Sequence, residues 1–395
     1  MSWFAILTLA GFSVAVLSAA VFRNRVFATF VGVLTGIHSL IAVALAPSFG
    51  PLLPVVAGLH VAVYLNFVLL SRPSMRGLLF RLLVSWPGAF FIGGTFLALP
   101  WAIVAAFGVT PVGFFVPYIL AFVGLAQSLG WRIGRREEID LVINDGPVAA
   151  LVPHPRGSAR MERPLRLVQI TDPHLGPFMS VARLRRIAEE AVALQPDLVL
   201  LTGDFLTMES QRDPDLLRQA FEPLQALPGR VFACHGNHDH EAPQIVADAL
   251  ANNGIKLLVD EAQEVETGAG PVQILGMDFV WRDRAAHLAK VCAAHPRKEG
   301  MTRLVLLHDP GAFQHLPEGE GDLVLAGHTH GGQVGLVSLG LSWTFLRLFG
   351  IRMPDHGFWA RGRDRMYVHR GTGHYGFPLR LGVPSEESLL RVHRP

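Results

Sequence analysis

The stretch Leu165-Arg-Leu-Val-Gln-Ile-Thr-Asp-Pro-His174 joins a short aliphatic run to two residue types that bind metals. The run ends at Ile170 and reads as a strand of a buried sheet. A helix is predicted next, over Ser180–Leu194, because its apolar residues recur on one face and its first residue suits an N-cap. The stretch therefore predicts a strand, a loop carrying Asp172 and His174, and a helix.

The same alternation continues toward the C-terminus. Further strands are predicted at 197–201, 230–234, 255–259, 272–275, 303–307 and 322–326, and further helices at 214–227, 242–252 and 284–294. Strands that alternate with amphipathic helices are typical of layered α/β domains. We therefore expect an α/β domain with mixed sheets.

Polar residues of a few types follow five of these strands. They are Asp172 and His174, Asp204, the run Asn237-His238-Asp239, His308, and the pair His328 and His330. Open α/β sheets bring such residues together, because the loops at the carboxyl ends of neighbouring strands converge. Two divalent ions about 3.5–4 Å apart need a shared anionic ligand, and mixed nitrogen and oxygen donors suit Mn²⁺, Fe or Zn²⁺ better than Mg²⁺ or Ca²⁺. The pattern predicts a dinuclear metal site.

The order of these motifs along the chain is more specific than any one of them. Asp172-Pro-His174, Gly203-Asp204, Gly236-Asn-His-Asp239, His308 and Gly327-His-Thr-His330 together resemble the pattern of the calcineurin-like metallophosphoesterase family. The resemblance covers 165 to about 382. It implies a domain of the four-layer α/β/β/α type at 164–395 that hydrolyses phosphoric esters.

The resemblance also implies a role for each residue. Asp172, His174 and His330 would bind one metal, Asn237, His308 and His328 the other, and Asp204 both, while His238 would face the phosphoryl group as acid or charge stabiliser, with Asp239 orienting its ring. The implied cofactors are two divalent ions, with Mn²⁺ expected first and Fe or Zn²⁺ as alternatives.

A branch of the family is indicated by three longer motifs. Leu306-Leu-His-Asp-Pro310, Gly327-His-Thr-His-Gly-Gly-Gln333 and Arg370-Gly-Thr-Gly373 resemble the YaeI- and YkuE-like bacterial phosphodiesterases, many of which associate with membranes. Some members act on the lipid A precursor UDP-2,3-diacylglucosamine. This chain departs from the branch at Pro384-Ser-Glu-Glu387 and at His374-Tyr375, so the substrate does not transfer with the motifs.

The first third of the chain has a different character. Residues 1–130 contain five arginines and no lysine, so all 32 acidic residues of the chain lie further on. Five apolar stretches fill this part, at 3–22, 26–46, 52–70, 82–107 and 112–129, and each is close to the ~20 residues that cross a bilayer as a helix. We predict a transmembrane domain of about five helices at 1–130 and a linker at 131–163. His38 and His60 lie inside these stretches and are expected to hydrogen-bond to neighbouring helices.

The arginines predict the orientation. They follow the first, third and fifth stretches, at Arg23 and Arg25, at Arg72, Arg76 and Arg81, and at Arg132, Arg135 and Arg136. Arginine-rich loops stay in the cytoplasm, which makes the chain an integral protein of the inner or plasma membrane with a cytoplasmic catalytic domain. Four spans instead of five would reverse this. A cleaved signal peptide is disfavoured, because no basic residue precedes the first apolar run.

The remaining features limit the function. The formal net charge is +2 and no basic face is evident, so a nucleic-acid partner is not expected, and two cysteines give no disulfide framework. The expected function is hydrolysis of a phosphodiester or pyrophosphate bond at the cytoplasmic membrane face, with a phosphoester substrate that is lipid-linked. A membrane-anchored nucleotide or cyclic-nucleotide phosphodiesterase and an inactive sensor with this fold are the alternatives. The apolar segment 336–358 either dips into the bilayer interface or packs on its own domain.

Overall fold

The computed structural model describes residues 2–129, 135–143, 145–157, 162–376 and 379–394. Contacts between residues divide the chain into two compact units. A helical unit is formed by 1–131 with the short segments 208–210 and 376–381, and a catalytic unit is formed by the rest of the chain. Each unit is considered by itself.

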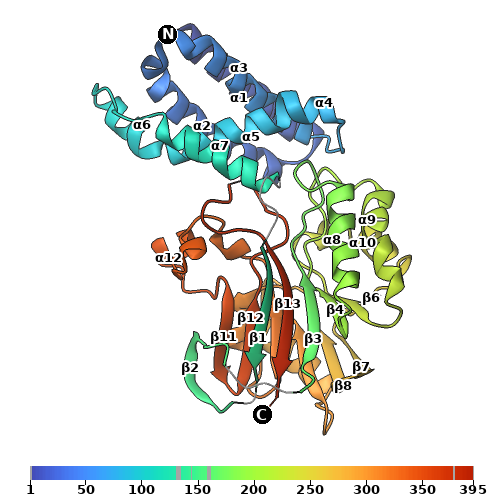
Figure 1. Cartoon of the computed structure of the whole chain (residues 1–395). Helices are drawn as coiled ribbons and strands as arrows, with labels where there is room; N and C mark the ends of the chain where they lie inside the picture. The colour runs from blue at the N-terminus through green and yellow to red at the C-terminus, as the bar shows by residue number, and fades with distance from the viewer. Residues whose placement is uncertain (1, 130–134, 144, 158–161, 377–378, 395) are drawn as a thin grey trace. The chain divides into compact units, whose positions relative to one another are not determined.

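The helical unit is built almost entirely from apolar helices (Figure 1). They are α1 (Trp3–Phe22), α2 (Arg25–Leu45), the 3-10 helix η1 (Ala46–Leu52), α3 (Leu53–Leu70), α4 (Leu78–Phe80), the π-helical turn η2 (Arg81–Ser85), α5 (Trp86–Leu97), α6 (Leu99–Ala106) and α7 (Val116–Ser128). Among the described residues, three helical runs are long and apolar enough to cross a membrane: Trp3–Phe22, Arg25–Leu70 and Leu78–Leu97. The chain therefore carries a membrane-embedding unit.

The long run Arg25–Leu70 is not one straight helix. Gly50 lies inside it at φ 50° and ψ −125°, a conformation that is not helical. His38 on α2 and His60 on α3 share a hydrogen bond of 2.9 Å, and Thr8 on α1 bonds to His60 at 3.0 Å. Residues equally far from Gly50 on either side can meet only if the chain folds back there. The two histidines therefore bond between neighbouring helices, as expected.

The last two predicted spans are less regular. The run that begins at Leu78 is interrupted at Ala98, and α6 continues for eight residues after it. Helix α7 has 13 residues, which at 1.5 Å per residue is shorter than a bilayer core of ~30 Å. The number of spans thus stays a prediction. Arg132, which we expected to mark the cytoplasmic end of the last one, lies outside the described residues.

The catalytic unit contains two sheets. The six-stranded sheet has the order β1 (Arg135–Val142), β13 (Glu386–His393), β3 (Leu165–Ile170), β4 (Leu198–Leu201), β5 (Val231–Ala233) and β6 (Lys256–Leu257). The seven-stranded sheet has the order β2 (Val148–Pro153), β11 (Gly357–Gly362), β12 (Asp364–Val368), β10 (Leu323–Ala326), β9 (Thr302–Leu306), β8 (Gly270–Gly276) and β7 (Glu261–Thr267). The α-helices are α8 (Val181–Ala193), α9 (Pro214–Phe221), α10 (Pro243–Ala251), α11 (Arg284–Ala294) and α12 (Phe345–Leu348), and the 3-10 helices are η3 (Glu222–Ala226), η4 (Asp239–Glu241), η5 (Pro310–His315), η6 (His330–Gly332) and η7 (Val337–Leu339).

Both sheets are mixed, as the sequence predicts. Strands β3 to β6 are parallel, and β13 runs antiparallel to β3. In the other sheet β8, β9, β10 and β12 are parallel, whereas β7 and β11 are antiparallel to their neighbours. The predicted N-cap of the first helix is confirmed, because the Ser180 hydroxyl accepts the Arg183 N–H at 3.2 Å.

Three buried clusters show four layers. One cluster joins a face of β3 to β5 to α8, α9 and α10, through residues such as Val168, Val199 and Leu184. The alternate residues of the same strands, such as Leu167 and Leu200, pack against the second sheet. The outer face of the second sheet packs against α11. Because side chains alternate across a strand, each strand of this kind is apolar on both faces. The order of layers is helix, sheet, sheet, helix, as expected.

The segment 131–163, predicted as a linker, contains two strands in its described part. Strand β1 pairs with β13 over eight residues, and β2 pairs with β11. In β1, Ile139 and Leu141 are fully buried in the core between the sheets. The segment is thus part of both sheets and not a free connector. The partners that create this core, β11 and β13, lie more than 200 residues further along the chain.

Candidate metal centre

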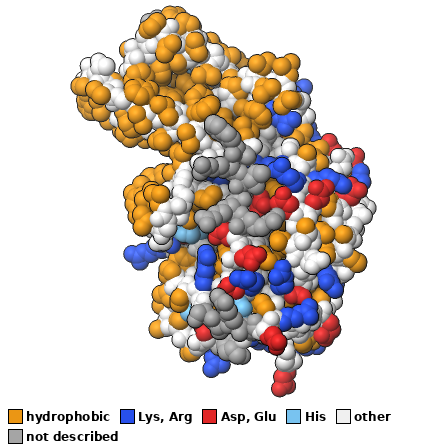
Figure 2. All heavy atoms as spheres, viewed as in Figure 1, with side chains coloured by type: hydrophobic (Ala, Val, Ile, Leu, Met, Phe, Trp, Pro, Cys, Tyr) orange, Lys and Arg blue, Asp and Glu red, His pale blue; other side chains and the backbone are white. Residues whose placement is uncertain are grey.

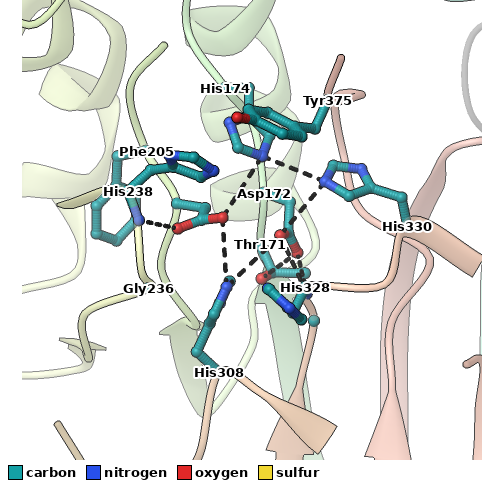
Figure 3. A network of polar contacts seen from close by, with 12 residues as sticks. Thr171, Asp172, His174, Phe205, Gly236, His238, His308, His328, His330 and Tyr375 are labelled. Carbon is teal, nitrogen blue, oxygen red and sulfur yellow. Dashed lines mark hydrogen bonds and ion pairs between the residues drawn. The ribbon is translucent and has the colours of Figure 1, made fainter. Parts of the chain in front are cut away.

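The predicted site residues come from the carboxyl ends of parallel strands in both sheets. Asp172 and His174 follow β3, Asp204 follows β4, and Asn237 and His238 follow β5, all in the six-stranded sheet. From the other sheet, His308 follows β9, and His328 and His330 follow β10. Figure 3 shows side chains from both sheets pointing toward one another. The site therefore forms where the two sheets meet at one edge.

Six of the seven predicted metal ligands form two groups of three. Asp172, His174 and His330 make one group, and Asp204, His308 and His328 the other, each with its ligand atoms within 4.8 Å of one another. In the first group His330 Nε2 lies 3.2 Å from His174 Nε2 and 3.5 Å from Asp172 Oδ1.

One carboxylate oxygen belongs to neither group alone. Asp204 Oδ2 lies 3.3 Å from His308 Nε2 and 3.7 Å from His174 Nε2, so it faces a histidine of each group. A shared anionic ligand of this kind is what two adjacent cations require to offset their repulsion.

Backbone conformation sets the directions of these side chains. Five site residues have left-handed backbone, namely Asp172 (φ 50°), His174 (φ 44°), Asp204 (φ 57°), His328 (φ 67°) and His330 (φ 51°). A non-glycine residue in this region costs about 1–3 kcal/mol, and such strain concentrates at functional sites where the surroundings enforce it. The loops are therefore held in conformations that they would not adopt alone.

Glycines in the motifs allow the loops to approach closely. A Cβ on Gly327 would lie 2.2 Å from Asp172 Oδ2, and one on Gly203 would lie 2.2 Å from the Gly236 nitrogen. No side chain fits at either place. These contacts explain why a glycine precedes Asp204 and His328 in the sequence.

Hydrogen bonds fix the ligands from behind. Asp172 accepts the Thr171 hydroxyl at 2.7 Å and the His328 N–H at 3.0 Å. His308 Nδ1 lies 2.6 Å from the Thr202 carbonyl oxygen, which holds the Nδ1 proton and leaves Nε2 as the free ligand atom.

Two buried atoms fit a metal in particular. His308 Nε2 and Asn237 Oδ1 are buried and have no hydrogen-bond partner among the described residues. Buried polar atoms are nearly always satisfied, so an unsatisfied acceptor and an unsatisfied imidazole nitrogen beside a carboxylate cluster match the donor set of a metal site. Asn237 lies next to His238, whose N–H donates to Asp204 Oδ1 at 2.9 Å.

Burial controls the charges in the cluster. It lowers the pKa of His174 to about 3 and of His328 to about 4, so both imidazoles are neutral and ready to bind a cation. Burial, together with the charge of Asp204, raises the pKa of Asp172 to about 6. For Asp204 the effect of burial is outweighed by the charge of His308, which lowers its pKa well below the usual range. The acidic partner that faces both groups is therefore the one that stays ionised.

Asp239 has a different role from the predicted one. Its carboxylate accepts the backbone N–H groups of Asp204 at 2.7 Å, Phe205 at 2.9 Å and Gly236 at 2.8 Å. It is fully buried and ties the loops after β4 and β5 together. It does not orient the His238 ring.

Glu241 is the residue that holds His238. His238 Nδ1 lies 2.9 Å from Glu241 Oε1. Burial alone would lower the pKa of His238, but this hydrogen bond and the charges of Asp204 and Glu241 raise it above its usual value. A protonated histidine beside the metal-ligand cluster can donate a proton or stabilise negative charge.

Tyr375 was not assigned a role from the sequence. Its ring centroid lies 4.4 Å from that of His238 and 4.9 Å from that of His174, and it is 43% exposed. Figure 3 shows it above His174. Gln333 binds its backbone on both sides, at 3.0 and 3.1 Å. The only signal for it was that His374-Tyr375 departs from the branch pattern.

A third group of possible ligands lies outside the dinuclear arrangement. His235 Nδ1 and His240 Nε2 approach the same oxygen of Asp278, at 3.0 and 3.1 Å. Hydrogen bonds from both imidazoles to one carboxylate account for this geometry without an ion. His240 is exposed, in keeping with the surface position expected for it.

Fold and site together define a class: an α/β/β/α hydrolase with a dinuclear metal centre at the edge shared by its sheets. The comparisons with known proteins agree. The family model for calcineurin-like phosphoesterases matches residues 165–332. Over 242 residues the chain is 30% identical to the uncharacterized metallophosphoesterase YkoQ of Bacillus subtilis (strain 168), covering 58% of this chain and 83% of the relative. The chain belongs to the calcineurin-like metallophosphoesterase family, whose members hydrolyse phosphoric esters with divalent metals.

Two other relatives have more specific names. The chain is 28% identical over 235 residues to phosphodiesterase YaeI of Escherichia coli (strain K12), covering 58% of this chain and 82% of the relative. It is 25% identical over 281 residues to the UDP-2,3-diacylglucosamine pyrophosphatase LpxG of Chlamydia trachomatis, covering 58% and 83%. The family and the branch expected from the motifs are thus confirmed.

Proposed function

We propose that the chain hydrolyses a phosphodiester or pyrophosphate bond of a lipid-linked substrate at the cytoplasmic face of the membrane. The observation that carries the proposal is the position of Asp204, whose Oδ2 faces one histidine of each ligand group. A single-metal site would not need a carboxylate in that place.

The proposed chemistry assigns a task to each part of the site. Two divalent ions held by the two groups supply Lewis-acid chemistry: they draw negative charge from a phosphoryl oxygen and favour deprotonation of water. Asp172, Asp204, Asn237 and the four histidines would hold them. His238, protonated and positioned by Glu241, would stabilise charge on the phosphoryl group or protonate the leaving oxygen. Mn²⁺ is the expected metal, with Fe or Zn²⁺ as alternatives.

The membrane setting supports the choice of a lipid substrate. An enzyme that acts on soluble nucleotides needs at most one anchoring helix, whereas this chain has three helical runs of spanning character. A relative is named a UDP-2,3-diacylglucosamine pyrophosphatase. The positions of the arginines among the apolar stretches favour a cytoplasmic catalytic unit.

The test uses the full chain, purified in detergent and stripped of metals. We expect turnover of bis-p-nitrophenyl phosphate when Mn²⁺ is added, and its loss in Asp204→Ala and His308→Ala. Asp215→Ala, which removes an exposed carboxylate on α9, is the matched control and should retain full turnover. Equal turnover in Asp204→Ala and in the wild type would refute the two-metal proposal.

The substrate and the orientation need separate measurements. Hydrolysis of UDP-2,3-diacylglucosamine in mixed micelles should exceed that of cyclic nucleotides, and the reverse order would favour the nucleotide phosphodiesterase. For orientation, a cysteine placed at the exposed Glu299 should react with a membrane-impermeant maleimide only after the membrane is opened. Reaction in intact cells would place the catalytic unit outside.

A further inference from the structure

An exposed apolar segment follows the last metal ligands. Over 336–351 it carries eight large hydrophobic side chains that are 39–72% exposed: Leu336, Leu339, Leu341, Trp343, Phe345, Leu348, Phe349 and Ile351. Figure 2 shows hydrophobic side chains gathered over this part of the catalytic unit, around α12. Exposed apolar patches of this density mark a surface that binds an apolar partner.

The segment is a built structure and not a loose loop. The Leu336 N–H donates to the Trp343 carbonyl at 2.8 Å, and the Phe345 N–H donates to the Val334 carbonyl at 2.7 Å, so its two ends are paired. Thr344 is fully buried and bonds to the buried Asp355 carboxylate. The backbone at the base is thus fixed while the apolar side chains point outward.

The base of the segment is joined to the metal-binding loop. The Thr329 hydroxyl, between His328 and His330, donates to the Asp355 carbonyl at 2.7 Å. Gly332 packs so closely on the segment that a Cβ there would lie 3.2 Å from Leu346 Cγ. A partner that binds the segment is therefore held close to the metal centre.

We infer that this segment, 336–352, inserts its apolar side chains into the interface of a lipid bilayer. The charge pattern favours a bilayer over a protein partner: 336–354 contains no acidic residue, and Arg347 and Arg352 accompany the apolar residues. Aromatic and aliphatic side chains with arginines suit the boundary between anionic headgroups and acyl chains. The helical unit, on the same chain, keeps a bilayer within reach.

The inference deepens the proposed function, because a segment seated in the bilayer would bring the metal centre to substrates that stay in the membrane. It rests on that function only for this consequence. Lipid contact itself can be measured without any turnover.

Lipid contact is tested by fluorescence quenching on the full chain in nanodiscs of phosphatidylcholine and phosphatidylglycerol. The environment-sensitive dye NBD is attached to Leu348→Cys or Phe349→Cys, with Glu299→Cys as the exposed polar control; the native Cys234 and Cys292 are buried. Doxyl groups on the acyl chains should quench the dye at 348 and 349 and leave the dye at 299 unchanged. Equal quenching at all three positions, or none at 348 and 349, would overturn the inference. So would an apolar NBD spectrum at 348 without quenching, since a second chain or another protein would then cover the segment.

The functional consequence is tested with Leu348→Ser/Phe349→Ser. Turnover of hexadecyl p-nitrophenyl phosphate embedded in vesicles should fall by about tenfold, since two apolar side chains no longer enter the bilayer. Turnover of the soluble bis-p-nitrophenyl phosphate should not change, and Val259→Ser, at another exposed apolar residue, should affect neither. Equal loss on both substrates would contradict a docking role. Quenching at 348 and 349 with no turnover of either substrate would support docking and refute the proposed hydrolase.

Discussion

Asp239→Asn separates two accounts of a buried carboxylate. The sequence motif implied that Asp239 orients His238, whereas the structure shows it accepting three backbone N–H groups. Two of these, from Asp204 and Gly236, share Oδ2, and the third, from Phe205, uses Oδ1. An asparagine retains one oxygen, so at least one N–H loses its acceptor and faces an amide group.

The magnitude follows from the bonds. Hydrogen bonds to a charged group contribute about 1.5–3 kcal/mol and neutral ones about 1 kcal/mol, while an unsatisfied buried donor costs about 1–3 kcal/mol. Weakening two bonds and losing the third should cost the catalytic unit about 3–5 kcal/mol. For a domain of this size that lowers the melting temperature by about 6–20 °C.

Glu241→Gln is the matched comparison. Glu241 is partly exposed and contacts His238, so its substitution should change the free energy of unfolding by less than about 0.5 kcal/mol. It should lower kcat about 3–10-fold, the equivalent of about one hydrogen bond. Thermal unfolding in detergent, followed by circular dichroism, and turnover of bis-p-nitrophenyl phosphate measure the two effects. A wild-type melting temperature in Asp239→Asn, with the kinetic defect of Glu241→Gln, would refute our reading of Asp239.

Three further predictions follow from the structure. Gly327→Ala should abolish metal binding, measured by isothermal titration with Mn²⁺, because its Cβ would lie 2.2 Å from Asp172 Oδ2; unchanged affinity would mean that the loop can move. Burial alone would raise the pKa of Asp355, but hydrogen bonds from His356 and Thr344 and the charge of Arg347 lower it to about 2. Its stabilisation of about 2 kcal/mol is therefore full above pH ~4 and lost as the pH falls to ~2, so the difference in unfolding free energy between wild type and Asp355→Asn should shrink over that range; a constant difference would contradict this. Removing the metals with EDTA should abolish turnover and lower stability, and Mn²⁺ at a hundred times its dissociation constant should restore about 2.7 kcal/mol; turnover that survives chelation would contradict a metal-dependent reaction.

Much of the site was predictable because its signal is local. Each ligand follows a short aliphatic strand such as Leu323–Ala326, and parallel strands bring their carboxyl ends to one edge. The order of the motifs then identified the family. Glycines such as Gly327 are explained only by the structure, which shows the carboxylate that occupies the space of a side chain.

The features that the sequence did not reveal depend on distant partners. Strand β1 is recognisable only beside β13, which inserts between β1 and β3 from the far end of the chain. Glu241 has no motif of its own, and its role follows from the 3-10 turn η4 that places it beside His238. Tyr375 reaches the site because Gln333 holds its backbone, a pairing across 42 residues. Periodicity carries no information on such contacts.

The measurement that tests the central claim most directly is anomalous diffraction from crystals of the full chain grown with Mn²⁺. We predict two anomalous peaks about 3.5–4 Å apart, with a carboxylate oxygen of Asp204 within bonding distance of both. One ligand group should surround each peak, with Asn237 beside His308 and His328. A single peak, or two peaks of which only one contacts Asp204, would contradict the two-metal account.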